Sequence, residues 1–228
     1  MTEIVVLKDL RALFGEARNQ GPRPTCLAFA SSDAHAAVRP GWTPLSCEFA
    51  FYRAQRRVGR LSSQGALLSG MLEALRKDGQ PEEAGWPYQT ATPTDVASWT
   101  PPDNVGPLFG RASETRPPLL DKVIQALDAD SPSILLLTLS RAFYVPSADA
   151  VIHPAAGEGP DLARRHAVVA AAHGTIDGER AVLVRNSWGL KWGTGGYGWL
   201  TDTFLAPRLF AAATLTENVD VSASPAAA

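Results

Sequence analysis

A proline-rich connection separates two parts of this chain that differ in residue pattern. Residues 81–118 contain segments such as GWPYQTATPTD and WTPPDNVGP. Proline lacks the backbone N–H that helices and central strands use for hydrogen bonding, so we expect an irregular crossing between two lobes. Because helical patterns precede the crossing and strand patterns follow it, the sequence predicts an α+β fold.

Three helices are expected before the crossing. The first covers about residues 25–38, where small and apolar residues follow Pro24. The second begins after Ser46, a favourable N-cap residue, and ends at about Val58. The third covers about residues 66–76 and ends before Gly79. The first part of the chain is therefore expected to form a helical lobe.

Strand patterns dominate after the crossing. A short helix is expected at about residues 119–127, followed by a continuous apolar run of strand length at 133–139. Further strands, separated by glycine-rich turns, are expected at residues 166–172, 180–185, 197–201 and 211–215. We expect one domain of residues 1–228, with a helical lobe at about 10–110, a β lobe at about 111–217 and a disordered tail at 218–228.

Composition and charge argue against several classes of partner. The 228 residues are 45% hydrophobic and 19% charged, as in an ordinary globular protein, and the formal net charge is −2. No block of Lys or Arg indicates binding to nucleic acid or to an acidic membrane, and no apolar run reaches membrane-spanning length. The opening TEIVVLKDLR lacks the pattern of a signal peptide, so a cytoplasmic protein is expected.

Cys26 is the first candidate for chemistry. It stands at the start of the first expected helix, in the stretch NQGPRPTCLAFA, where the positive end of a helix dipole favours a thiolate. Free cysteine is also among the most buried residue types, so position alone leaves a reactive and an inert interpretation open. A reactive cysteine needs a base and a group that orients the base. His166, at the start of an expected strand, and Asn186, after another, are candidates for these roles.

These residues lie in motifs that resemble the papain-like cysteine peptidases over about residues 9–215. The matching stretches are Gln20-Gly21, Ala28-Phe29-Ala30, His166-Ala167-Val168, Asn186-Ser187-Trp188-Gly189 and Gly196-Tyr197-Gly198. The surrounding sequence is similar to the bacterial branch of the family that has no pro-segment. The resemblance implies a papain-like two-lobe fold, with a helical N-terminal lobe, an antiparallel β-barrel-like C-terminal lobe and the active-site cleft between them.

The resemblance also implies a role for each residue of the site. Cys26 would attack a carbonyl carbon as a thiolate, and His166 would act as acid and base. Asn186 would orient the ring of His166. Gln20 would stabilise the oxyanion through its side-chain N–H, together with the backbone N–H of Cys26. No metal and no organic cofactor is expected.

Other residues are expected to support this site or to bind substrate. Trp188 would keep water away from the contact between His166 and Asn186, with Trp192 in support. The expected substrate-binding residues are Gly65, Ala66, Leu67, Leu68, Ser133, Leu135, Arg165 and Ala167. By the resemblance, Leu67, Leu68, Ala167 and the Ser133 to Leu135 region would line the main specificity pocket and favour an apolar side chain two residues before the cleaved bond. Arg164 or Arg165 at its rim could instead favour an acidic one.

The sequence also departs from the family pattern around the nucleophile. Pro24-Thr25 stand in place of the usual Gly-Ser, and Leu27 replaces the usual tryptophan. Arg23 stands near the position where secreted members carry a cysteine of their first disulfide, so that disulfide cannot form. Because the chain has only two cysteines, Cys26 and Cys47 are expected to be free thiols. Ala66 replaces one glycine of a pair that borders the cleft. These changes raise the question of how well the oxyanion loop is formed.

The expected function is therefore that of a cysteine peptidase that hydrolyses peptide or protein substrates through an acyl-enzyme. Two alternatives stay open: an acyl or peptide transferase with the same nucleophile, and a catalytically silent peptide-binding module. Without a pro-segment, activity would be restrained by narrow specificity, a regulatory or inhibitory partner protein, oligomer assembly or co-expression with one target. His35, His153, His173 and Cys47 are expected to be structural.

Overall fold

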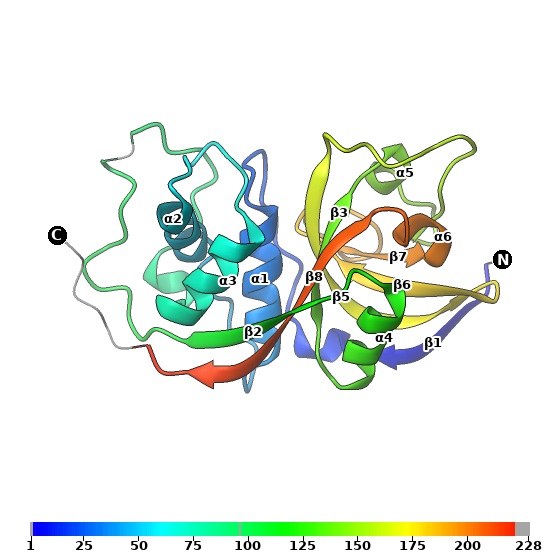
Figure 1. The fold of residues 1–228 in the computed structure, drawn as a ribbon, viewed down its shortest axis with the longest axis horizontal. Helices are drawn as coiled ribbons and strands as arrows, with labels where there is room; N and C mark the ends of the chain where they lie inside the picture. The colour runs from blue at the N-terminus through cyan, green and yellow to red at the C-terminus, as the bar shows by residue number, and fades with distance from the viewer. Residues whose placement is uncertain (1, 96, 222–228) are drawn as a thin grey trace. The chain divides into compact units, whose positions relative to one another are not determined.

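The computed structural model describes residues 2–95 and 97–221 and divides into two compact units (Figure 1). The β unit comprises Met1–Asn19 and Thr115–Thr214, and the helical unit comprises Gln20–Glu114 and Leu215–Ala228. The first 19 residues thus belong to the β unit, whereas the expected helical lobe began at about residue 10. The cause is a strand that the sequence did not predict, β1 (Ile4–Asp9), which pairs with β5 (Arg165–Ile176).

The helical unit contains the three expected helices, α1 (Cys26–Ala37), α2 (Cys47–Val58) and α3 (Leu68–Lys77), together with the 3-10 turn η2 (Glu83–Gly85). Helix α1 is buried from Leu27 to Ala37. Most of its side chains are small, so a fully surrounded helix can pack closely against its neighbours. The nucleophile candidate is the first residue of this central helix.

Local signals fix the ends and the packing of α2. The Ser46 hydroxyl accepts a hydrogen bond from the backbone N–H of Phe49 at 3.0 Å, as expected for an N-cap. Gly59 ends the helix in the left-handed region at a φ of 63°. A Cβ atom at Gly70 of α3 would lie only 2.9 Å from a methyl carbon of Val58, so Gly70 allows the two helices to approach closely.

The β unit is built on a mainly antiparallel sheet. Its strands are β3 (Ser133–Thr138), β4 (Val151–Ile152), β5, β6 (Glu179–Arg185), β7 (Tyr197–Thr201) and the first part of β8 (Leu209–Val219). The order is β8-β3-β5-β6-β7-β4, with β1 also on β5, and β2 (Gly110–Arg116) neighbours β8 at one end. The short pair of β4 and β7 is parallel, a detail that the expected antiparallel lobe did not include.

Short helices complete the β unit: α4 (Leu120–Asp128), α5 (Arg141–Tyr144), α6 (Asp202–Leu205) and the 3-10 turn η1 (Arg11–Leu13). Leu127 of α4 and Phe204 of α6 join Leu135, Val168 and Val182 of the sheet in one buried core. The core therefore fixes the strands β3, β5 and β6, and each of them carries or adjoins a candidate site residue at one end.

The expected elements are found with small shifts of their ends, and the expected α+β fold is confirmed. β1, β2 and β4 were not predicted. β2 has the sequence GRASETR, which lacks a clear apolar alternation, and β4 has only two residues. The disordered tail was expected to begin at residue 218, but β8 extends to Val219. Residues 222–228 of that tail lie outside the described residues.

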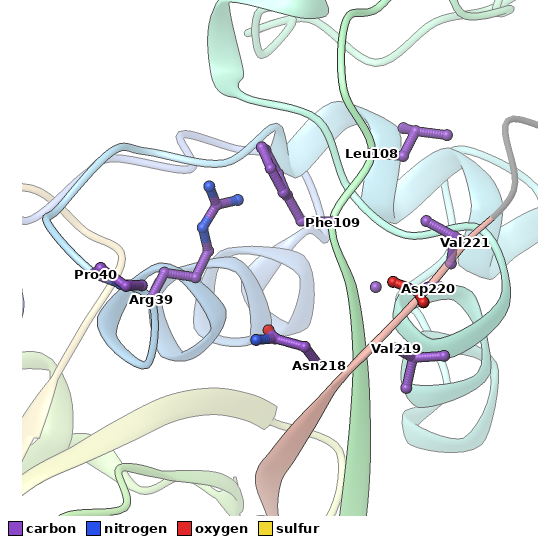
Figure 2. Close-up of a pocket in the computed structure, with 9 residues that line it drawn as sticks. Arg39, Pro40, Leu108, Phe109, Asn218, Val219, Asp220 and Val221 are labelled. Atoms are coloured by element: carbon purple, nitrogen blue, oxygen red, sulfur yellow. The ribbon is translucent and has the colours of Figure 1, made fainter.

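A pocket of about 400 Å³ lies in the helical unit (Figure 2). The guanidinium of Arg39 lies over the ring of Phe109, with its carbon 3.3 Å from the ring centroid. The remaining lining residues are Pro40, Leu108, Gly110, Asn218, Val219, Asp220 and Val221. None of the lining residues is a predicted site residue.

The described helices include none with the length and apolar character that crossing a membrane requires.

Candidate active site

Two neighbouring strands position the candidate base and its orienting amide. His166 is the second residue of β5, and Asn186 directly follows the last residue of β6. β5 and β6 are antiparallel, with Val169 opposite Arg185, so the start of one strand meets the end of the other. The local sequences thus bring together two residues that are 20 positions apart.

The contact between these side chains is a short hydrogen bond. Nε2 of His166 lies 2.7 Å from Oδ1 of Asn186, and the same oxygen accepts the backbone N–H of Ser187 at 2.8 Å. An amide oxygen only accepts hydrogen bonds, so His166 carries its proton on Nε2 when the ring is neutral. This tautomer directs the Nδ1 lone pair to the other side of the ring, where it can accept a proton.

An aromatic cluster covers His166. The ring of Trp188 lies with its centroid 4.7 Å from that of His166, and the ring of Phe143 lies 5.7 Å away. Tyr144 stacks on Trp188 at 5.3 Å. The indole N–H of Trp192 donates to the carbonyl oxygen of Phe143 at 3.0 Å. The sequence predicted the two tryptophans but missed Phe143 and Tyr144, which come from the short helix α5.

Burial controls the charge of His166. The side chain is 6% exposed, and desolvation lowers its pKa from the ordinary 6.5 to about 4, although the hydrogen bond to Asn186 acts in the opposite direction. At neutral pH the ring is therefore neutral, as a proton acceptor must be. A protonated His166 requires an adjacent anion that offsets the loss of hydration.

Cys26 occupies the first position of α1 and is partly exposed, whereas Cys47 is buried. Neither cysteine is in a disulfide. At the start of a helix the unpaired backbone N–H groups and the helix dipole stabilise a thiolate. Cys47 also begins a helix, α2, so it is the exposure of Cys26 that favours it over Cys47 as the reactive thiol.

The loop before Cys26 is held by hydrogen bonds within the helical unit. Nε2 of Gln20 donates to the carbonyl oxygen of Arg23 at 2.9 Å, and the backbone N–H of Thr25 donates to the same oxygen at 2.9 Å. Tyr88 contacts both ends of the loop, the carbonyl oxygen of Gln20 at 2.7 Å and the hydroxyl of Thr25 at 2.8 Å. The loop that carries the Pro24-Thr25 substitution is thus held by several hydrogen bonds.

A buried ion pair anchors the same loop to α2. The two terminal nitrogens of Arg23 lie 2.6 Å and 2.9 Å from the carboxylate oxygens of Glu48, and both side chains are fully buried. Glu48 also accepts the indole N–H of Trp99 at 2.7 Å and the backbone N–H of Gln89 at 3.0 Å. Each carboxylate oxygen of Glu48 therefore accepts two hydrogen bonds, one from Arg23 and one from Trp99 or Gln89. No local pattern in the sequence indicates the pairing of Arg23 with Glu48.

The expected substrate-binding residues are divided between the two units. In the helical unit, a Cβ at Gly65 would lie 3.9 Å from the carbonyl oxygen of Pro24, so this residue adjoins the loop before the nucleophile. Leu67 is exposed, and Ala66 and Leu68 are partly buried. In the β unit, Ser133, Leu135 and Ala167 are buried and Arg165 is exposed. Leu135 belongs to the core of that unit.

Of the three histidines outside the site, two have side-chain hydrogen-bond partners and one is exposed. His35 is buried in α1 with Nδ1 3.2 Å from Oε1 of Gln80, and desolvation lowers its pKa to about 3. His173 lies within β5, with Nε2 2.8 Å from Oδ1 of Asp128. His153 is exposed after β4. Among the described residues, no group of three or more His, Cys, Asp or Glu side chains is arranged to hold a metal ion.

Solved structures with a similar fold include proteases. The chain is similar to xylellain, a cysteine protease from Xylella fastidiosa, with a TM-score of 0.78 and 20% identity over 94% of this chain and 87% of that one. It is similar also to the bromelain protease from Ananas comosus, with a TM-score of 0.69 and 19% identity over 93% of this chain and 98% of that one. At these identities the likeness establishes the fold.

Sequence comparison adds the family. A cysteine protease of Blomia tropicalis is 28% identical over 127 residues, which are 54% of this chain and 36% of that protein. The chain therefore matches only about a third of the length of this relative. The model of the papain family cysteine proteases matches residues 45–204. This range includes His166 and Asn186, whereas Gln20 and Cys26 lie before it. The chain belongs to the papain family of cysteine proteases.

Proposed function

We propose that this protein is a cysteine peptidase that hydrolyses peptide bonds, with Cys26 as nucleophile, His166 as acid and base, Asn186 as the orienting group and Gln20 in the oxyanion hole. The observation that carries the proposal is the 2.7 Å contact of His166 with Asn186 in a chain of this family. That contact fixes the tautomer and the ring plane that a base for a thiol requires.

The charge requirements of the two half-sites support pairing of Cys26 with His166. The start of α1 favours a negative Cys26, and a protonated His166 requires an adjacent anion because its surroundings are dry. A thiolate and an imidazolium satisfy each other's requirement. In catalysis the thiolate attacks the carbonyl carbon, His166 gives its proton to the leaving amine, and the neutral ring then activates the water that releases the acid.

Without the thiolate of Cys26, the buried ring of His166 has no anion to stabilise its protonated form. The free energy of unfolding of the Cys26→Ala variant is therefore expected to depend on pH. His166 then has a folded pKa of about 4, below the value of about 6.5 in an unfolded chain, so the unfolded chain binds the proton first as the pH falls. The free energy of unfolding is expected to decrease from pH 6.5 to about pH 4, by up to about 3 kcal/mol from this residue.

Urea denaturation at several pH values measures this effect. Adding His166→Gln to the Cys26→Ala background should remove that share of the pH dependence, whereas adding His153→Gln, at an exposed histidine, should leave it unchanged. Equal pH dependence with and without His166 would contradict the assignment of a buried, neutral ring.

The ordered loop before α1 argues against a catalytically silent module. Pro24 and Thr25 do not displace the loop from its hydrogen bonds, because Thr25 bonds to Tyr88 and Gln20 bonds to Arg23. A module that only bound peptides would gain nothing from the dry, oriented contact between His166 and Asn186.

Product analysis tests hydrolysis directly. The protein, kept under reducing conditions, is incubated with a mixture of unstructured peptides in ¹⁸O-water, and the products are identified by mass spectrometry. Hydrolysis predicts cleaved peptides whose new carboxyl ends carry ¹⁸O. With a competing amine present, products that carry only the amine would favour the acyl or peptide transferase instead. Intact peptides in every sample would contradict both.

We also propose that the protein acts in the cytoplasm on peptide or protein substrates. The support is that neither Cys26 nor Cys47 is in a disulfide, as is usual in a reducing compartment.

A further inference from the structure

The hydroxyl of Tyr88 lies against both ends of the loop that leads to Cys26. It donates to the carbonyl oxygen of Gln20 at 2.7 Å and lies 2.8 Å from the hydroxyl of Thr25, the residue that precedes Cys26. A phenol has only one hydrogen, and here Gln20 receives it. The Thr25 hydroxyl therefore donates to the phenol oxygen, so that Tyr88 links the two ends in one chain of hydrogen bonds.

The surroundings of Tyr88 hold this hydroxyl in place. Its ring packs edge-on against Phe29 of α1, with the centroids 4.8 Å apart, and the guanidinium of Arg23 lies 5.0 Å from the ring centroid. The backbone N–H of Tyr88 donates to a carboxylate oxygen of Glu83 at 2.8 Å. Burial raises the pKa of the phenol, which therefore stays protonated and able to donate at any pH relevant to activity.

The residues that Tyr88 holds are the ones on which the oxyanion hole depends. Gln20 would supply one donor from its side chain, and the backbone N–H of Cys26 would supply the other. The peptide group between Thr25 and Cys26 carries that second N–H. Fixing the Gln20 carbonyl and the Thr25 side chain therefore restricts the orientation of both donors, and such donors act only when they are preorganised.

We propose that Tyr88 is a positioning residue of the oxyanion hole, which acts through Gln20 and Thr25 rather than by touching the substrate. This inference rests on the proposed cysteine peptidase function. It also explains how the loop tolerates Thr25 in place of the usual serine: the threonine hydroxyl retains a partner in Tyr88.

The Tyr88→Phe variant tests the inference, because it removes the hydroxyl and keeps the ring packed against Phe29. We expect kcat for peptide hydrolysis to fall about tenfold, with KM within about twofold of the parent, since the lost interaction matters only in the transition state. The matched control is Tyr52→Phe, in the same unit, whose ring packs on Trp86 and Trp99. This control should change kcat less than twofold.

Two further measurements separate positioning from a general structural effect. Alkylation of Cys26 by a haloacetamide forms no oxyanion, so its rate should be the same in the parent and in Tyr88→Phe. In a Gln20→Ala background, which itself should lower kcat about 10²- to 10³-fold, Tyr88→Phe should lower kcat threefold or less. A tenfold effect in both backgrounds, or an equal loss of alkylation rate, would overturn the inference.

The outcomes also distinguish this inference from the proposed function. If Cys26→Ala abolishes hydrolysis but Tyr88→Phe retains full kcat, only the role of Tyr88 is wrong. If the parent cleaves no peptide and Cys26 resists alkylation, the proposed function itself fails. Should Tyr88→Phe not fold, Thr25→Val removes the other hydroxyl of the pair and is expected to show the same loss of kcat at unchanged KM.

Discussion

Replacement of Cys26 by alanine is expected to lower kcat/KM for peptide hydrolysis on the order of 10⁴-fold or more. The variant has no thiolate, so no acyl-enzyme can form, and only substrate binding and the oxyanion donors remain. Removing a nucleophile from a comparable three-residue site costs about as much as removing the whole site. Initial rates on a fluorogenic peptide, under reducing conditions, measure the effect.

The other cysteine provides the matched control. Cys47→Ala removes a thiol of the same size from the same unit, but Cys47 is fully buried at the start of α2 and is expected to have no part in the reaction. Its kcat/KM should stay within about twofold of the parent. A Cys26→Ala variant that keeps a tenth or more of the parent activity would contradict the assignment of the nucleophile.

The second large effect is expected from Glu48→Gln, which should lower the free energy of unfolding by about 3–5 kcal/mol. The change keeps the shape of the side chain but leaves the charge of Arg23 buried without compensation, a loss of this size in other proteins. It also removes the charge from the acceptor of the Trp99 indole and the Gln89 backbone. Urea denaturation followed by tryptophan fluorescence measures the loss.

Glu73→Gln is the control for this prediction. Glu73 lies 4.0 Å from Arg57, and its side chain is 50% exposed. Exposed pairs of this kind contribute little, so the control should change stability by less than about 0.5 kcal/mol. A loss below 1 kcal/mol for Glu48→Gln would show that the Arg23–Glu48 pair does not anchor the loop before Cys26.

Local sequence signals account for much of the fold and of the candidate site. Helix α2 begins directly after Ser46 and ends at Val58, as the pattern predicted. His166 and Asn186 lie in short motifs at the ends of two strands that pair with each other, so their contact follows once the hairpin is recognised. In these cases each residue's role is set by its own neighbours in the chain.

Long-range contacts account for what the sequence did not predict. Glu48 and Arg23 are 25 positions apart, and Tyr88 and Gln20 are 68 apart, and no periodicity or spacing relates them. Phe143 covers His166 only because α5 packs beside β5 and β6. β1 was missed because Ile4 to Leu7 form an apolar run of only four residues, without the alternation of apolar and polar residues that marks a half-buried strand. In the structure all four residues are exposed. Such features depend on the assembled fold.

The most direct test of the central claim is to find which thiol reacts with a thiol-directed epoxide. The protein is incubated with one equivalent of the reagent, digested and examined by mass spectrometry. The account predicts one adduct, on Cys26, with loss of peptide hydrolysis in proportion to labelling. It also predicts that labelling slows in the His166→Ala variant. An adduct on Cys47, no adduct at all, or a fully labelled Cys26 with full activity would contradict it.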